Sequence, residues 1–155
     1  MIQIPRNQFR GGKITVSKTL IVDDSAIFRK LLKETLHSRY PSMEIVEAAD
    51  GVEAMQKINS YHPDLIFMDI RLPGETGLKL TQKIKRVLPQ TNIIILTNYD
   101  LPEYREAASK FAANHFLSKG VTTGDQISTI VESIIAHAGI HEKNLVNENI
   151  QNGEA

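Results

Sequence analysis

The sequence predicts an α/β protein in which five parallel strands form one sheet with helices on both faces. Five apolar runs alternate with five segments that carry apolar residues at helical spacing. Three runs, TLIV, LIFM and NIIIL, are continuously apolar, which is typical of strands covered on both faces. Five such repeats favour a doubly wound parallel sheet. The predicted strands are residues 19–23, 44–49, 65–69, 92–97 and 115–118.

The helices are predicted from apolar residues three or four positions apart. The fourth segment is shorter and more polar, and Pro102 suits the first turn of its helix. Pro41, Pro63 and Pro89 each stand shortly before a strand, where proline ends the preceding helix. The predicted helices are residues 25–38, 51–61, 77–88, 102–111 and 125–138. Their apolar stripes include Phe28, Leu32 and Leu36 in the first, Met55 and Ile58 in the second, Leu80 and Ile84 in the third, and Ile127, Val131 and Ile134 in the last.

Length and composition fit one globular domain. A chain of 155 residues is large enough for a buried core. Cysteine is absent, which excludes disulfides and thiolate chemistry. No apolar run approaches the roughly 18 residues of a membrane helix, and the N-terminus lacks the apolar segment of a signal peptide. We therefore expect a cytoplasmic protein with no membrane partner.

The charge is unevenly distributed. Residues 1–18 carry four basic residues and no acid, yet the body has no basic stripe of the kind that binds nucleic acid. The polar residues after about 140 lack a sustained helical period. We therefore predict a flexible basic leader at 1–17, one folded domain at 18–140 and a polar, disordered tail at 141–155, with no direct nucleic-acid binding by this chain.

Polar side chains gather at the carboxyl ends of the predicted strands, the edge where open α/β sheets bind ligands. Asp23 and Asp24 follow the first strand and Asp69 the third, while Thr97 and Lys119 end the fourth and fifth. Each alone has a simpler interpretation. An aspartate pair before a helix is often an N-cap, a single aspartate after a strand often belongs to a turn, and a lysine there often faces solvent. Their joint occurrence on one edge favours a shared site.

Three carboxylates at one edge repel one another, and a hard divalent cation removes the repulsion. Mg²⁺ prefers such oxygen ligands. A bound cation also allows a carboxylate to attack a phosphoryl group, because it neutralises charge on the phosphoryl oxygens. Lys119 and the Thr97 hydroxyl are suited to contact the remaining phosphoryl oxygens.

Four segments of the sequence resemble the response-regulator receiver domains of two-component signalling. They are LIVDDS at 20–25, LIFMDIRLPGETGL at 65–78, IIILTNY at 93–99 and FLSKG at 116–120. The resemblance covers roughly residues 18–140. It implies the CheY-like, flavodoxin-like (βα)5 fold, with strand order 2-1-3-4-5.

The resemblance also implies a role for each matching residue. Asp69 matches the aspartate that accepts a phosphoryl group from a histidine kinase or phosphotransfer protein. Asp23 and Asp24 match the acidic pair that holds Mg²⁺, together with Asp69 and the backbone carbonyl of Arg71. The remaining matches are Thr97, the switch hydroxyl; Lys119, the phosphoryl-binding lysine; and Phe116, the aromatic that moves inward on activation.

Two positions depart from the usual receiver pattern. Gly120 stands where proline is common after the lysine, and this form resembles receivers that precede a helix-turn-helix output domain. Asn98 stands where a smaller residue is common after Thr97. Both departures bear on kinetics rather than on the capacity for phosphorylation. We further hypothesise that Arg71 and Tyr99, two residues past Asp69 and Thr97, obstruct the attacking water and prolong the phosphorylated state, whereas the simpler view is that both face solvent.

The expected function is a phosphorylation-dependent switch and not an enzyme, apart from its own phosphorylation and dephosphorylation. Phosphate on Asp69 adds charge. We expect Thr97 to turn toward it and Phe116 to fill the space behind, unless Phe116 is plain core. The surface of the fourth helix, fifth strand and fifth helix then binds an output partner or a second copy of the chain. The chain is either a stand-alone receiver or the receiver piece of a longer DNA-binding regulator.

Other classes fit less well. A haloacid-dehalogenase-type phosphohydrolase needs a second aspartate where Arg71 stands. A pseudo-receiver that only binds partners would be indicated by loss of Asp69 or Lys119, and both are present. Dinucleotide binding and a P-loop are disfavoured because the first βα turn reads DDSAIF and contains no glycine.

Overall fold

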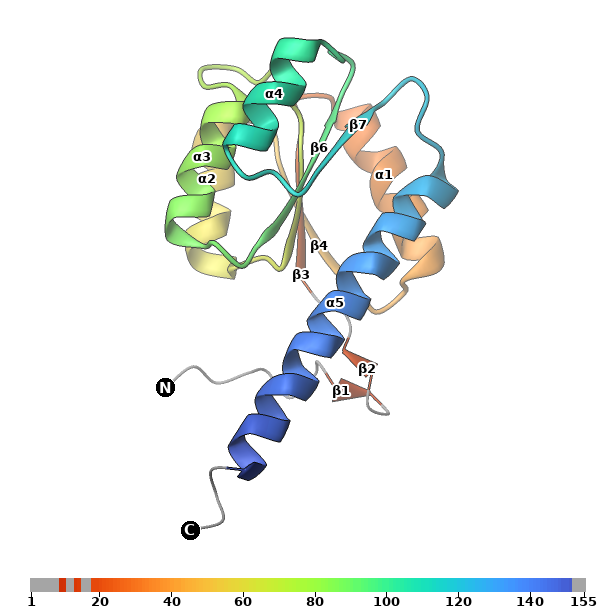
Figure 1. Ribbon diagram of the computed structural model, residues 1–155. Coiled ribbons are helices and arrows are strands. Elements are labelled where there is room, and N and C mark those ends of the chain that lie inside the picture. The colour runs from red at the N-terminus through yellow and green to blue at the C-terminus, as the bar shows by residue number, and fades with distance from the viewer. Residues whose placement is uncertain (1–8, 11–12, 15–17, 152–155) are drawn as a thin grey trace.

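Five parallel strands form the central sheet of the computed structural model (Figure 1). The structure describes the backbone of residues 9–10, 13–14 and 18–151, and the side chains of residues 18–137. The sheet order is β4-β3-β5-β6-β7, and every pairing in it is parallel. This is the predicted order 2-1-3-4-5. The strands are β3 Lys18–Val22, β4 Glu44–Ala48, β5 Leu65–Met68, β6 Asn92–Thr97 and β7 His115–Ser118.

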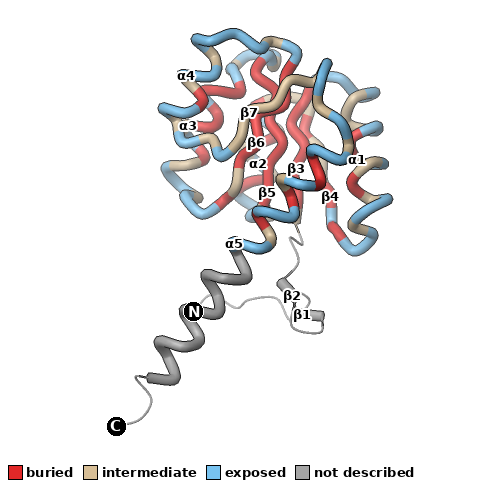
Figure 2. The backbone as a smooth tube through the Cα atoms, turned by 45° about the vertical axis from the view of Figure 1, so that its right-hand side comes forward, coloured by how far each residue is buried: buried red, intermediate tan, exposed pale blue. Residues whose placement is uncertain are grey.

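Helices cover both faces of the sheet, as alternating side chains along the buried strands require. Leu20, Ile66 and Ile93 face a core closed by α2, α3 and α4, whereas Ile21, Phe67 and Ile94 face a core closed by α1 and α5. Figure 2 shows the buried residues concentrated along these strands. The helices are α1 Ala26–Arg39, α2 Gly51–Tyr61, α3 Gly77–Val87, α4 Pro102–Lys110 and α5 Gly124–Gln151.

Side-chain caps explain where three of the helices begin. The side chains of Ser25, Asp50 and Thr76 accept hydrogen bonds from backbone N–H groups three residues on, at the starts of α1, α2 and α3. Ser25 is therefore the N-cap of α1, so neither Asp23 nor Asp24 is needed for that purpose. The simpler interpretation of the aspartate pair as a helix cap is wrong.

Both ends of the chain differ from the sequence prediction. Helix α5 continues to Gln151, whereas a tail without helix was expected from residue 141. The sequence from 141 to 151 contains no proline or glycine and several good helix formers, so the backbone continues the helix after the apolar period fades. In the leader, β1 Phe9–Arg10 pairs antiparallel with β2 Lys13–Ile14. The rest of the predicted leader and residues 152–155 lie outside the described residues.

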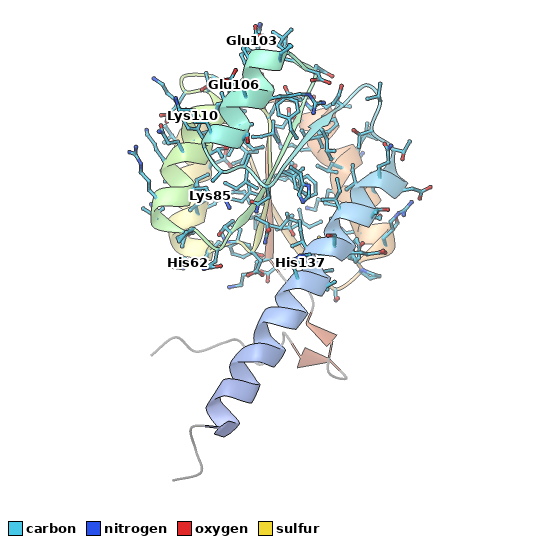
Figure 3. All side chains as sticks on the ribbon, viewed as in Figure 1. His62, Lys85, Glu103, Glu106, Lys110 and His137 are labelled. Atoms are coloured by element: carbon cyan, nitrogen blue, oxygen red, sulfur yellow. The ribbon has the colours of Figure 1, made fainter. Side chains whose placement is uncertain are left out.

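The two ends of the sheet differ in the side chains they carry. In Figure 3, Glu103, Glu106 and Lys110 lie along α4, while His62 and Lys85 lie toward the opposite end of the sheet. Lys85 Nζ donates there to the carbonyl of Thr91 at 2.6 Å and to Asn114 Oδ1 at 2.8 Å, and partial burial lowers the pKa of Lys85. This lysine joins α3 to the loops before β6 and β7, far from the predicted site.

Among the described helices, none is long and apolar enough to cross a membrane.

Candidate functional site

Two neighbouring strands bring the acidic residues together. Strands β3 and β5 pair in the register Val22↔Met68, so Asp23 and Asp69 leave the sheet side by side. The N–H of Asp69 donates to Val22 O at 2.9 Å, and the N–H of Asp23 donates to Ala48 O at 3.0 Å. Carboxylate oxygens of Asp23, Asp24 and Asp69 all lie within 4.8 Å of one another. The structure thus assembles the three acids that the sequence predicted would share one edge.

Lys119, which directly follows the edge strand β7, completes this cluster. Its Nζ lies 2.5 Å from Asp23 Oδ2 and 3.2 Å from Asp69 Oδ2. The Lys119 N–H donates to Thr97 O at 2.9 Å, which holds the lysine backbone against the end of β6. The alternative that Lys119 faces solvent is therefore wrong: its side chain is only 9% exposed.

The charges in the cluster do not balance. Asp23 and Asp69 are buried, whereas Asp24 is exposed and makes no hydrogen bond or ion pair among the described residues. Burial raises the pKa of the Asp23 carboxyl, and the nearby Asp69 charge adds to this, although hydrogen bonds from Lys119 and the Ser25 N–H act in the opposite direction. One ammonium group serves three carboxylates, so the site favours a further cation.

The donor set fits Mg²⁺. All three side chains offer oxygen, the ligand type that Mg²⁺ prefers, and the exposed Asp24 leaves one side of the cluster open to water molecules that the ion retains. One oxygen of the Asp69 carboxylate is hydrogen-bonded to the adjacent backbone, since Oδ1 accepts from the Ile70 N–H at 2.8 Å. The Arg71 carbonyl follows in the same loop, and its part in metal binding stays a prediction.

The loop after Asp69 returns close to that residue. The N–H of Gly77 donates to Ile70 O at 2.8 Å. A Cβ added at Gly77 would lie 1.8 Å from the backbone oxygen of Asp69, so only glycine fits there. Gly74 in the same loop has φ +85°, a left-handed conformation that glycine adopts without strain. The start of α3 is thereby held against the phosphoacceptor candidate.

The two predicted switch residues lie on neighbouring strands. Thr97 is fully buried at the end of β6, and its Oγ1 accepts from the Tyr99 N–H at 3.3 Å. Phe116 on β7 pairs in register with Ile95 and packs against the core beneath α4, but it remains half-buried. The guanidinium of Arg105 covers the Phe116 ring, with Cζ 4.6 Å from the ring centroid. Phe116 is therefore not a fully enclosed core residue.

Arg71 and Tyr99 meet above the same end of the sheet. The Arg71 Cζ lies 3.8 Å from the centroid of the Tyr99 ring, a stacking distance for a cation on an aromatic face. Arg71 is exposed and Tyr99 is half-buried, so the simpler view that both only face solvent misses their contact.

The two departures from the receiver pattern, Asn98 and Gly120, are exposed, and a Cβ at Gly120 would meet no atom within 4 Å.

Two residues of α1 contact the site and were not predicted to do so. The Phe28 ring lies under Lys119, with Nζ 4.0 Å from its centroid, although its helical period indicated only core packing. Arg29 Nη1 donates to the backbone oxygen of Asp23 at 2.6 Å, although Arg29 is not one of the apolar residues that predicted this helix. Their position within one turn of the acidic pair is the signal that sequence reasoning overlooked.

Comparisons with known proteins agree with this geometry. The family model of the response regulator receiver domain matches residues 19–132. The oxygen regulatory protein NreC of Staphylococcus carnosus is 37% identical over 140 residues, which cover 87% of this chain and 64% of that protein. NreC of Staphylococcus aureus strain JH9 is 43% identical over 88 residues, or 56% of this chain and 41% of the relative. The chain thus spans less than two thirds of the length of these curated relatives.

Solved structures give the same answer. A CheY-like receiver domain from Methanospirillum hungatei superposes with TM-score 0.72 at 26% identity and covers 83% of this chain and 99% of its own. The Thermotoga maritima response regulator TrrA, solved in complex with Mg²⁺ and BeF, superposes with TM-score 0.67 at 34% identity. The match covers 76% of this chain and 98% of TrrA. With the matched family model, the strand order and the acidic cluster in agreement, the chain belongs to the response-regulator receiver domains of two-component signalling.

Proposed function

We propose that the chain works in the cytoplasm as a phosphorylation-dependent switch, with Asp69 as the phosphoacceptor and a histidine kinase or phosphotransfer protein as the donor. The observation that carries this proposal is the convergence of Asp23, Asp24 and Asp69 with Lys119 at one edge of the sheet. Receivers are signalling domains rather than enzymes in the usual sense. The only chemistry proposed for the chain is gain and loss of its own phosphoryl group.

The proposed step is an in-line displacement at phosphorus. A carboxylate oxygen of Asp69 forms a bond to the phosphorus of a phosphohistidine, the N–P bond breaks, and the imidazole leaves with the electron pair and takes up a proton. Asp23, Asp24, Asp69 and the Arg71 carbonyl would hold Mg²⁺, which when bound would supply charge neutralisation for the phosphoryl oxygens. Lys119 is placed to hold a further oxygen, because its ammonium already lies 3.2 Å from Asp69 Oδ2.

The new phosphate is proposed to act through Thr97 and Phe116. A phosphoryl group on Asp69 offers the Thr97 hydroxyl a charged acceptor for its proton, whereas the Thr97 Oγ1 otherwise only accepts a weak hydrogen bond from the Tyr99 N–H at 3.3 Å. Movement of Thr97 leaves room for the half-buried Phe116 ring to turn inward. The groove of about 500 Å³ between α4, β7 and α5, which Phe116, Arg105 and Val121 help to line, then changes shape. An output partner or a second copy of the chain binds this surface.

Arg71 and Tyr99 are proposed to slow loss of the phosphoryl group. Their side chains stack into a bulky pair. Because they follow Asp69 and Thr97 by two residues, we expect this pair to flank the approach to Asp69. The test is the lifetime of the phosphorylated protein in Arg71→Ala, Tyr99→Ala and the double variant. We expect each to shorten it, and the double variant to shorten it no more than the single changes combined. An unchanged lifetime in all three would reject this role.

The length of the relatives favours a second form of the same function. Because the chain spans less than two thirds of the NreC proteins, and a LuxR-family response regulator from Aurantimonas superposes with TM-score 0.71 at 27% identity, the receiver is a candidate piece of a longer DNA-binding regulator. In that form the output partner is a domain of the same polypeptide. A pseudo-receiver without phosphorylation has no specific observation in its favour.

The decisive test is phosphorylation by acetyl phosphate with Mg²⁺, followed by intact-mass spectrometry. Wild type is expected to gain one phosphoryl group, and Asp69→Asn is expected to gain none. Asp125→Asn is the matched control, because Asp125 is an exposed aspartate at the start of α5. Incorporation by Asp69→Asn at the wild-type level would show that Asp69 is not the acceptor.

A further inference from the structure

Arg29 makes the least expected contact with the acidic turn. Its guanidinium reaches back from the first turn of α1, where Nη1 donates to the backbone oxygen of Asp23 at 2.6 Å. Its Nε donates to Glu47 Oε1 on β4 at 3.1 Å. The Arg29 side chain is only 16% exposed. The proposed phosphorylation chemistry assigns no task to this residue.

Besides its ion pair with Lys119, Asp23 is held in place by three hydrogen bonds, two through its backbone and one through its carboxylate. Its N–H is held by Ala48 O at 3.0 Å, its carboxylate accepts from the Ser25 N–H at 2.8 Å, and its carbonyl is held by Arg29. That carbonyl belongs to the peptide unit that joins Asp23 to Asp24. Because the peptide unit is planar, holding its oxygen sets the direction in which the Asp24 residue begins.

Asp24 depends on this backbone for its position. Its side chain is exposed and makes no hydrogen bond or ion pair with the other described residues, in contrast to the buried Asp23 and Asp69. Nonetheless its carboxylate oxygen lies within 4.8 Å of theirs. The peptide orientation that Arg29 maintains is therefore the local feature that presents Asp24 to the cluster.

Glu47 in turn orients Arg29. Besides Arg29, it contacts Lys33 Nζ at 3.7 Å, so two cations from α1 hold one carboxylate of β4. The Glu47 charge offsets that of Arg29, so we expect the hydrogen bond to Asp23 O to matter more than long-range attraction between Arg29 and the acids. A plain ion pair between α1 and β4 would contribute little to stability and would not affect metal binding.

We propose that Arg29 is a positioning residue for the divalent-cation site. It holds the peptide carbonyl between Asp23 and Asp24, Glu47 orients it, and Asp24 is thereby presented to the ion. This inference rests on the proposed function, since it concerns the same Mg²⁺ site. The guanidinium serves two acceptors at once, the Asp23 carbonyl and Glu47, which a lysine ammonium reproduces poorly.

The test is Mg²⁺ affinity, measured by isothermal titration calorimetry on the unphosphorylated protein. Arg29→Met keeps much of the side-chain volume and is expected to weaken binding about tenfold, the usual cost of removing a group that orients a metal ligand. Arg29→Lys is expected to restore only part of the loss, and Glu47→Gln to cause a smaller loss. Arg39→Met is the control, because Arg39 lies on the same helix and pairs with Asp125 instead.

A double-variant cycle shows whether Arg29 acts through Asp24. When all four proteins of the cycle are measured with Mn²⁺ as the probe, Arg29→Met is expected to cause little further loss in an Asp24→Asn background. Thermal unfolding in EDTA shows that each variant remains folded at the temperature of the titration. Wild-type affinity in Arg29→Met, or an equal loss with and without Asp24, would overturn the proposal. If wild type itself bound no Mg²⁺, the proposed function would fail instead, so the two failures are distinguishable.

Discussion

The two halves of the functional edge differ in how firmly they hold their side chains. At the ends of β3 and β5, Asp23 and Asp69 are buried, and each has backbone as well as side-chain hydrogen bonds. At the ends of β6 and β7, Thr97 has one 3.3 Å contact for its hydroxyl, and every residue of the edge strand β7 is only half-buried. Helix α4 also begins without a side-chain cap.

This difference matches two physical requirements. Metal binding and phosphoryl transfer need ligands held in a fixed geometry, which a well-bonded turn provides. A switch needs an element with two arrangements of similar free energy, which a fully packed element rarely provides. We expect substitutions in the β3–β5 half to affect stability and metal affinity, and substitutions in the β6–β7 half to shift the balance between two conformations.

Gly77→Ala tests the firmly held half and is expected to have the largest effect. The new Cβ would overlap the backbone oxygen of Asp69, so α3 and the loop after Asp69 must shift. Overpacking against backbone is expected to cost about 3 kcal/mol of unfolding free energy and to weaken Mg²⁺ binding. Urea denaturation and calorimetry measure the two effects.

Gly120→Ala is the control for this substitution, since its Cβ would meet no atom within 4 Å. It is expected to change stability by less than about 0.5 kcal/mol. If the two alanine variants were equally stable, the tight contact between Gly77 and Asp69 would not be a feature of the folded protein.

The sequence alone predicts most of this architecture, because burial on both faces of a parallel sheet leaves a strong pattern. Strands β6 and β7 and helix α2 have the predicted bounds. Strands β4 and β5 end one residue earlier than predicted, and β3 begins and ends one residue earlier. The three acids and Lys119 were also predicted to gather, since the carboxyl ends of parallel strands share one edge. The sequence therefore predicts the order of the strands and helices and the polar residues that follow the strands.

Contacts made by long side chains across elements were not predictable in the same way. Arg29 donates both to Asp23 O and to Glu47, which is distant in sequence, and no periodic pattern marks that pairing. The sequence predicted that Arg71 and Tyr99 flank one approach, but not that they stack. The end of α5 was misplaced because the apolar period reports burial, whereas the backbone continues the helix without it.

Ala112→Gly tests whether the β6–β7 half carries strain that sequence patterns do not reveal. Ala112 follows α4 with φ 66°, a left-handed conformation that is unfavourable for alanine and easily adopted by glycine. We expect the variant to be more stable by about 0.5–1 kcal/mol, because relief of strain exceeds the added entropy of the unfolded chain.

Ala113→Gly is the matched control. Its φ is not positive, and its side chain packs against the core beneath α4, so glycine there is expected to lower stability. Equal destabilisation by both glycine substitutions would show that the left-handed residue after α4 is not strained.

Arg105→Ala tests whether the switch half is held in one conformation by a surface contact. Arg105 covers the Phe116 ring and pairs with Asp100 through two contacts of 2.5 and 2.9 Å. Without this cover, the proposed inward position of Phe116 is expected to become more favourable by about 0.5–1 kcal/mol. Affinity for beryllofluoride with Mg²⁺, a stand-in for the phosphoryl group, is expected to rise about two- to fivefold.

Glu106→Ala is the control for Arg105, because Glu106 lies on the same helix (Figure 3) and is exposed. It is expected to leave the beryllofluoride affinity unchanged. An Arg105→Ala affinity equal to that of wild type would mean that the stacking contact does not bias Phe116, and the contrast between the two halves would then rest on burial alone.

His115→Gln is expected to have the smallest effect, and it tests whether the partial burial of β7 affects the titration of a residue on that strand. Partial burial lowers the pKa of His115 below its usual 6.5, so the folded protein favours the neutral imidazole. The unfolded chain therefore binds the proton more readily, and this contribution to stability is lost as pH falls through 6.5 toward the lower folded-state pKa. We expect His115→Gln to lose less thermal stability than wild type between about pH 8 and pH 5. The same substitution at the exposed His62 is the control, and if the two variants had the same pH dependence, burial of β7 would be too slight to affect the titration of His115.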